Sequence, residues 1–156
     1  MSTYSSAAAA LLSLTLLACG TTAPDQMSSP EQTSTAEQTS TAAALHDIWA
    51  LHTLDGQAYA PAEGLERPRL ELNLTDMRAL GNDGCNAFTG DIREADAEKL
   101  AFGPLAGTRK LCRDGMDAAD AFNRRLAQTA AYRREGLTLT LLDGEGAALM
   151  TLRKAD

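Results

Sequence analysis

Two short segments in which apolar residues alternate with other residues constrain the fold most. In "RLELNL" at residues 69–74 and "LTLTLL" at 137–142, leucines recur at every second position. Successive side chains of a strand point to opposite faces of a sheet, so this pattern predicts strands with one buried face. "AALMTLR" at 147–153 follows after the turn-forming "DGEG", which predicts a hairpin. The leucines of the second segment that we expect to point inward are Leu137, Leu139 and Leu141.

Weaker strand signals occupy much of the remaining chain from residue 45 onward. They lie at 48–54, 57–59, 77–80, 89–93, 99–102 and 107–111. The segment from Asp114 to Ala130 differs, because its apolar residues recur at intervals of three and four, which predicts an amphipathic helix. These apolar residues are Met116, Ala119, Phe122, Leu126 and Ala130. Asp114 is expected to cap the first helical turn.

Together these elements predict a mainly β (α+β) domain over residues 45–156. About seven to eight short antiparallel strands form a sheet, and the single helix is inserted before the last strands. Both faces of such a sheet cannot remain exposed, so we expect the helix to cover the sheet or plug its open end.

The first eighteen residues predict a signal peptide. "AAAALLSLTLLAC" at 7–19 is an apolar run that suits a secretory signal and is too short to span a bilayer. "LLAC" at 16–19 looks like the bacterial lipobox, which implies cleavage after Ala18 and lipidation of Cys19. The alternative is an ordinary signal peptide, cleaved near Ala18, with an unmodified Cys19. The absence of Lys and Arg from "MSTYSS" leaves that alternative open.

Residues 19–44 predict a flexible tether between this anchor and the domain. The segment is rich in Ser, Thr and Gln and contains "EQTSTA" twice in tandem. A chain this poor in large apolar residues cannot offset its ordering entropy, so we expect it to be disordered. The expected location is the cell envelope, on the periplasmic side of the outer membrane if the organism is Gram-negative.

The charge of the chain argues against a nucleic-acid partner. Lys and Arg number 14 against 21 Asp and Glu, which gives a net charge of −7. A phosphate-binding surface needs clustered cations, and the sequence has no basic stripe. The expected partners are instead the membrane, through the anchor, and another envelope protein or a hydrophobic ligand.

The order of motifs resembles the META/HslJ family of bacterial envelope proteins. The resemblance is carried by "IWALHTLDGQ" at 48–57, "GCNAFTG" at 84–90, "LAFGPLAGTRKLC" at 100–112 and the last hairpin at 137–153. The residues that match the family pattern are Gly84, Cys85, Asn86, Phe88, Gly90, Thr108, Arg109 and Cys112. The resemblance implies a compact, partly open antiparallel barrel with one helix. It implies no catalytic activity, and it associates the chain with envelope function and stress response only in loose terms.

Cys85 and Cys112 are the two cysteines that remain once Cys19 is set aside. An even count in an exported domain favours a disulfide, and closing a loop of about 28 residues would stabilise the fold by roughly 3–4 kcal/mol. Free thiols, a zinc site shared with His46 and His52, and a catalytic thiol remain as alternatives. The spacing of the cysteines and histidines is unlike that of zinc sites, and we expect no metal or cofactor.

The remaining motif residues have structural explanations. Gly84 is expected to supply a positive φ, and Asn86 to adopt a left-handed conformation or bond locally. Arg109 is expected to pair with a carboxylate or backbone carbonyls, Asp83 being one possible partner. Phe88 and Trp49 are expected to pack in the core.

Three functions are compatible with these residues. The first is a non-catalytic, lipid-anchored envelope protein that works by binding, and the second is a structural or stress-protective lipoprotein. The third is a thiol–disulfide redox protein that uses Cys85 and Cys112. These cysteines are not arranged as CxxC, so nothing in the sequence indicates a lowered thiol pKa.

Overall fold

The computed structural model describes residues 42–155 as nine strands and the helix α2. The predictions for the signal peptide, Cys19 and nearly all of the tether therefore lie outside the described residues. The elements are β1 Ile48–Leu54, β2 Gln57–Ala58, β3 Arg69–Asn73, β4 Arg78–Asn82, β5 Ala87–Ala95, β6 Leu100–Gly107, α2 Met116–Gln128, β7 Ala131–Glu135, β8 Thr138–Leu142 and β9 Ala148–Lys154.

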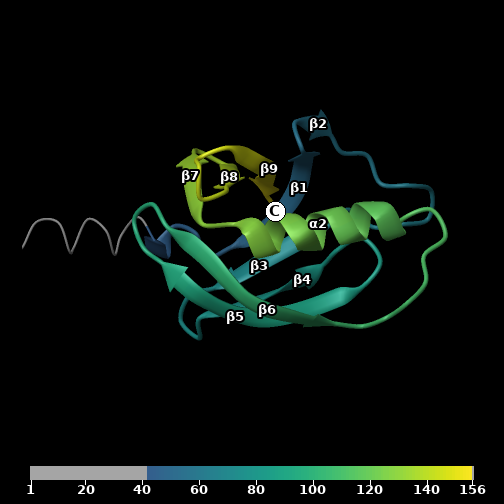
Figure 1. Ribbon diagram of the computed structural model, residues 1–156, viewed down its shortest axis with the longest axis horizontal. Coiled ribbons are helices and arrows are strands. Elements are labelled where there is room, and N and C mark those ends of the chain that lie inside the picture. The colour runs from purple at the N-terminus through teal and green to yellow at the C-terminus, as the bar shows by residue number, and fades with distance from the viewer. Residues whose placement is uncertain (1–41, 156) are drawn as a thin grey trace, which may run out of the picture.

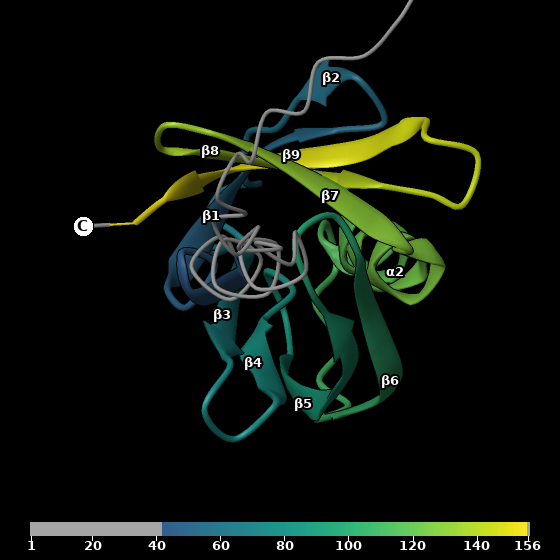
Figure 2. The ribbon, with the colours of Figure 1, turned by 90° about the vertical axis from the view of Figure 1, so that its left-hand side faces the viewer.

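All strands belong to one antiparallel sheet that curls into a half-barrel, as predicted (Figure 1). The order is β6-β5-β4-β3-β1-β9-β8-β7, with β2 paired to β1 beside this path. The two ends of the sheet, β6 and β7, meet at one point only. There Lys99 bridges Ala131, and Tyr132 N donates to Glu98 O at 2.9 Å. Figure 2 shows α2 beside the gap where β6 and β7 diverge, so the helix plugs the open side of the barrel.

The core fills the concave side of the sheet under α2. Trp49 and Phe122 are its largest fully buried side chains, and Trp49 Nε1 donates to Leu45 O at 2.9 Å. The apolar stripe of α2 faces inward as predicted, with Phe122 and Leu126 fully buried. Phe88 also lies in the core, with its ring 6.0 Å from that of Phe122.

The last strands differ in two ways from the sequence prediction. β7 was not predicted, because three of its five residues, Arg133, Arg134 and Glu135, are charged and no apolar alternation is visible. Its strand conformation is supplied by pairing with β8. Leu137 was expected inside but is 64% exposed, because it lies in the turn between β7 and β8, before the alternation begins.

The segment that surrounds the start of α2 also differs from the prediction. The helix begins at Met116 after Gly115, and Asp114 makes no capping hydrogen bond. At the other end Ala130 lies beyond the helix and donates its N–H to Leu142 O in the sheet. The strand predicted at 107–111 is wrong as well, since β6 ends at Gly107 and the chain continues as a loop.

Candidate functional site

A tight turn precedes β5 and is built on the buried carboxylate of Asp83. Oδ1 of Asp83 accepts hydrogen bonds from the backbone N–H groups of Cys85 at 2.9 Å and Asn86 at 2.6 Å. Gly84 has φ +98°, which glycine adopts without strain, as the sequence predicted. Asp83 is only 3% exposed, so these bonds compensate the cost of removing its charge from water.

The side chain of Asn86 fastens the loop that follows β6. Its Oδ1 accepts hydrogen bonds from Lys110 N at 2.7 Å and Thr108 Oγ1 at 2.9 Å, and its Nδ2 donates to Lys110 O at 3.5 Å. The expectation of a left-handed or locally bonded Asn86 is therefore wrong, because the side chain bonds to residues 22 and 24 positions away. These bonds also explain the missing strand at 107–111, since the amide of Asn86 replaces a strand partner for Lys110.

The structure joins Cys85 and Cys112 in a disulfide, with an S–S distance of 2.06 Å. Cys85 is 6% exposed, whereas Cys112 is half-buried. The bond links the Asp83 turn to the loop before α2, two residues beyond the backbone held by Asn86. We call residues 108–112 the pinned loop, because Asn86 and the disulfide fix it at both ends.

The glycine that ends the family motif allows β5 and β6 to approach closely. A Cβ at Gly90 would lie 2.6 Å from Leu105 Cδ2 and 2.9 Å from Pro104 O. Gly81 on β4 is similar, since a Cβ there would meet the backbone oxygen of Arg69 and lie 2.6 Å from Phe88 Cζ. These contacts explain why positions 81 and 90 hold glycine.

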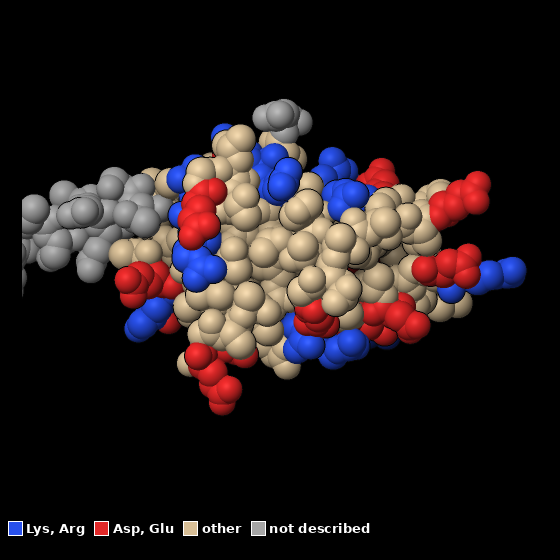
Figure 3. All heavy atoms as spheres, turned by 90° about the horizontal axis from the view of Figure 1, so that it is seen from above, with Lys and Arg blue, Asp and Glu red and all other residues tan. Residues whose placement is uncertain are grey.

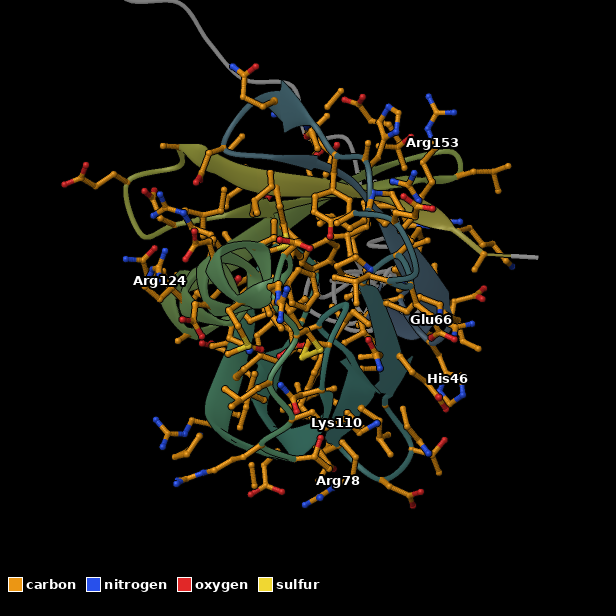
Figure 4. All side chains as sticks on the ribbon, turned by 90° about the vertical axis from the view of Figure 1, so that its right-hand side faces the viewer. His46, Glu66, Arg78, Lys110, Arg124 and Arg153 are labelled. Atoms are coloured by element: carbon orange, nitrogen blue, oxygen red, sulfur yellow. A yellow bond between two sulfur atoms is a disulfide. The ribbon has the colours of Figure 1, made fainter. Side chains whose placement is uncertain are left out.

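A groove of about 710 Å³ runs between α2 on one side and β6 with the pinned loop on the other. We call it the α2–β6 groove. Its apolar lining residues, glycines apart, are Phe88, Pro104, Leu105, Ala106, Leu111, Met116, Ala119 and Ala127. Its polar lining residues are Asp83, Asn86, Thr108, Arg109, Lys110, Asp120 and Asn123. Figure 4 shows Lys110 on the loop near the disulfide. Apolar surface combined with a few fixed polar groups is typical of ligand sites.

The polar groups of the groove include one buried acceptor without a hydrogen-bond partner. Asn123 on α2 donates through Nδ2 to Asp83 Oδ2 at 2.7 Å. Because a carboxylate only accepts, this bond leaves Asn123 Oδ1 facing away from Asp83. Among the described residues, Oδ1 has no donor and is nevertheless buried. This acceptor is closed off from solvent, so it lies within the wall of the groove and not on its open surface.

Arg109 and Lys110 form the cationic side of the groove. Both are exposed, and neither takes part in an ion pair between described residues. The expected pairing of Arg109 with a carboxylate or backbone carbonyls is not found among the described residues. Asp83, one possible partner, accepts hydrogen bonds from Cys85, Asn86 and Asn123 instead. Of the two motif residues Thr108 and Arg109, the first anchors the loop and the second projects from it.

Tyr59 lies beside the Asp83 turn. Burial raises the pKa of its hydroxyl above the ordinary value of 10.0, Arg67 opposes this, and the Asp83 carboxylate adds to it. Tyr59 therefore stays neutral at physiological pH.

The two histidines do not contribute to the groove. His46 accepts a hydrogen bond from Leu74 N at 3.2 Å, and His52 is exposed on β1. Across residues 42–155, no three His, Cys, Asp or Glu side chains gather as a metal site would require. Nor does this part of the chain contain a helix of the length and apolarity needed to cross a bilayer. On the face shown in Figure 3, cationic and anionic side chains are interspersed.

Sequence reasoning identified Asn86, Thr108, Arg109 and the cysteines but missed the groove itself. Asn123 and Lys110 gave no signal of their own, because polar residues on an amphipathic helix and in a loop are expected to be solvated. Their importance follows only from the position of α2 beside the pinned loop.

Comparison with known proteins agrees with this fold. Two solved structures align with probability 1.00. One, an NMR structure of a protein from Burkholderia xenovorans, has a TM-score of 0.56 and 24% identity over 74% of this chain and 87% of that one. The other NMR structure has a TM-score of 0.54 and 23% identity over 72% of this chain and 92% of that one. No curated protein sequence matches significantly. A family model for the META domain matches residues 42–156, and the chain belongs to the META domain family.

Proposed function

We propose that this chain is a non-catalytic, lipid-anchored binding protein of the bacterial cell envelope, of the HslJ type. Its ligand would occupy the α2–β6 groove, and the tether would hold the domain away from the membrane. In a Gram-negative organism the proposed location is the periplasmic side of the outer membrane. The proposed physiological role is protection of the envelope under stress.

The groove is the observation that carries the proposal. A volume of about 710 Å³ lies within the range of about 300–1,000 Å³ that small-ligand sites occupy. The pinned loop forms one wall, and its backbone is held by Asn86 and by the disulfide. A wall fixed before the ligand arrives lowers the entropy lost on binding.

The anchor is supported by the sequence around Cys19, and a single substitution tests it. In the native host, the unmodified protein is expected to incorporate a clickable palmitate analogue and to fractionate with membranes. The Cys19→Ser variant is expected to lose both properties, because the thiol that would form the thioether is gone. Label retained by Cys19→Ser would refute lipidation at this position.

Photo-crosslinking in living cells tests occupancy of the groove. A benzophenone amino acid is placed at Leu111 or Ala127, which line the groove, or at Leu137, which is exposed elsewhere. Leu111 and Ala127 are expected to give the same discrete adduct, and Leu137 to give none. No adduct at either groove position, or equal adducts at Leu137, would end the proposal. The stress role is tested separately by comparing a deletion strain with its parent under heat and detergent.

A further inference from the structure

The edge of β6 that faces away from β5 is only partly used by the sheet. β6 is the first strand in the sheet order, so β5 is its one neighbour along most of its length among the described strands. Near its start the other edge meets β7, where Leu100 N donates to Ala130 O at 3.4 Å. Beyond that point β6 and β7 diverge beside α2 (Figure 2). The second half of β6 therefore has an edge without a neighbouring strand.

This open edge presents the backbone groups of Leu105 and Gly107. Thr108 N donates to Ala87 O at 3.0 Å, so Thr108 faces β5. Successive residues of a strand direct their N–H and C=O groups to opposite sides, and the register is regular from Gly107 back to Leu105. The N–H and C=O groups of Gly107 and Leu105 therefore point away from β5, and within residues 42–155 they have no hydrogen-bond partner there. Both residues line the α2–β6 groove.

Charged side chains protect the other end of the sheet but not this edge. β7 ends in the exposed residues Arg133, Arg134 and Glu135, and charges on an edge strand discourage pairing with another chain. Residues 103–107 of β6, "GPLAG", carry no charge. Pro104 limits the open edge at one end, because proline has no N–H and the register of β5 and β6 shifts beside it. What remains is a short uncharged edge that begins at Leu105.

The open edge leads into the pinned loop, which carries two exposed cations. Neither Arg109 nor Lys110 forms an ion pair with a described residue. The backbone beneath them is held, because both the N–H and the C=O of Lys110 bond to Asn86. Fixed cations beside unpaired backbone donors and acceptors favour a ligand that combines an extended backbone with acidic side chains.

We infer that the α2–β6 groove binds an extended, acidic segment of a partner polypeptide, which adds to the edge of β6 as a further strand. Its backbone exchanges hydrogen bonds with Leu105 and Gly107, because an extended chain presents N–H and C=O groups at the same alternation. Every strand pair of the sheet is antiparallel, so the added strand is placed antiparallel to β6. An antiparallel segment begins beside the end of β6, which puts acidic residues at its N-terminal end next to Arg109 and Lys110. The inference rests on the proposed function and names its partner class.

Two peptides of the same composition test the charge and the direction. The first is acetyl-Asp-Glu-Thr-Val-Thr-Val and the second is acetyl-Thr-Val-Thr-Val-Asp-Glu, each blocked at the C-terminus by a neutral fluorophore. Fluorescence anisotropy measures their binding to the full-length oxidised chain in phosphatidylcholine nanodiscs. The first peptide is expected to bind about tenfold more tightly, because only its acidic residues reach the cations. Equal binding of the two peptides overturns the inference, and so does a first peptide that does not bind at about 1 mM.

N-methylation of the first peptide tests the addition of a strand. A strand at the edge of a sheet uses the N–H groups of every second residue, so methylation interferes in only one of two alternate sets. One set is the third and fifth nitrogens of the peptide, and the other is the fourth and sixth. One set is expected to weaken binding about tenfold, and the other to change it less than about threefold. Equal effects of the two sets overturn the inference, because a ligand that is not a strand has no such alternation.

Two substitutions at Gly107 test the same hydrogen bonds from the side of the protein. A Cβ at this position would lie 3.1 Å from Ala87 O, a contact that Gly107→Pro and Gly107→Ala both introduce. Only proline removes the N–H that faces the groove, and it spares the bonds between β6 and β5. Gly107→Pro is therefore expected to bind the first peptide about tenfold more weakly than Gly107→Ala. Equal binding by the two variants overturns the inference. If Gly107→Pro fails to fold, the methylated peptides decide the point.

Matched variants test the cations. Arg109→Gln combined with Lys110→Gln is expected to abolish the preference for the first peptide over the second. Arg113→Gln combined with Arg124→Gln makes the same change in net charge outside the groove lining, and the preference is expected to remain. Figure 4 shows Arg124 on the outer side of α2. Equal loss in both pairs indicates non-specific attraction and overturns the inference.

The crosslinking experiment separates this inference from the proposed function. Adducts at Leu111 and Ala127 that contain a lipid or another small molecule keep the proposed function and overturn the addition of a strand. Adducts that persist while the peptide tests fail also remove only the partner class. The absence of adducts at both positions ends the proposed function and this inference with it.

Discussion

Removal of the Asp83 carboxylate is expected to be among the most destabilising changes in the groove region. Asp83 is 3% exposed and accepts three hydrogen bonds, from Cys85 N at 2.9 Å, Asn86 N at 2.6 Å and Asn123 Nδ2 at 2.7 Å. Hydrogen bonds to a charged group contribute about 1.5–3 kcal/mol each, but such values are not additive. Water entering from the groove can replace part of the loss. We therefore expect Asp83→Ala to lower the free energy of unfolding by about 3–5 kcal/mol.

Asp83→Asn separates the hydrogen-bond acceptor from the charge. The new side chain keeps Oδ1 and with it both backbone bonds. Its amide group would face Asn123 Nδ2, but the Asn123 amide can rotate and present Oδ1, which has no other partner. The expected cost is smaller, about 1–2 kcal/mol. Asp120→Ala is the control, because Asp120 lines the same groove but is exposed, and its removal is expected to cost less than about 0.5 kcal/mol.

Urea unfolding followed by the fluorescence of Trp49 measures these changes. Trp49 is the only tryptophan and is fully buried, so its emission reports on the core. A shift in midpoint with an unchanged m-value shows a change in stability alone. The combination of Asp83→Ala with Asn123→Ala is expected to cost at least about 1 kcal/mol less than the sum of the single changes. A loss below about 1 kcal/mol for Asp83→Ala would show that the turn does not depend on this carboxylate.

Three further changes test other parts of the structure. Cys85→Ala combined with Cys112→Ala is expected to lower the free energy of unfolding, measured in urea, by about 3–4 kcal/mol, because the disulfide closes a loop over 27 positions. An unchanged urea midpoint of the unmodified protein after addition of reductant would contradict this expectation. Burial raises the pKa of the Tyr132 hydroxyl, so the stability contributed by the neutral side chain is complete below the unfolded pKa near 10 and is lost as the pH rises through the folded pKa. Tyr132→Phe is therefore expected to make the alkaline fall in the urea midpoint shallower. An identical fall in the variant would refute this. Gly81→Ala is expected to lower the melting temperature by several degrees, because a Cβ would lie 2.6 Å from Phe88 Cζ, while Gly144→Ala, with open space around it, is expected to leave it unchanged in calorimetry.

The sheet was predictable where burial imposes a local pattern. The leucine alternation at 69–74 reports the inward face of β3, and β1 was predicted with its observed bounds Ile48–Leu54. β7 carries no such pattern, because Arg133, Arg134 and Glu135 are exposed and its strand conformation depends on β8. Patterns in the local sequence predict strands that bury one face. They do not predict an edge strand whose conformation depends on pairing with its neighbour.

The groove was not predictable because its bonds join distant residues. Asn86 was interpreted by its preference for turns, whereas its side chain bonds to Thr108 and Lys110. Asn123 was one polar residue of an amphipathic helix until α2 placed it against Asp83. Residue preferences describe the nearest few positions of the chain. Contacts across 22 to 40 positions depend on the path of the whole sheet.

The family motif and the cationic side of the groove carry out separable tasks. Asn86 and the disulfide position the pinned loop, and neither depends on the side chains of Arg109 or Lys110 for its own contacts. If the proposed binding occurs, changes at the two cations should alter it without altering stability, because their side chains are exposed. A change at Asn86 should alter both, since the loop backbone would lose its partners at the same time as the cations lose their position. The motif of residues 84–90 is thus best understood as the support of the proposed binding surface, to which residues 109–111 and α2 contribute side chains.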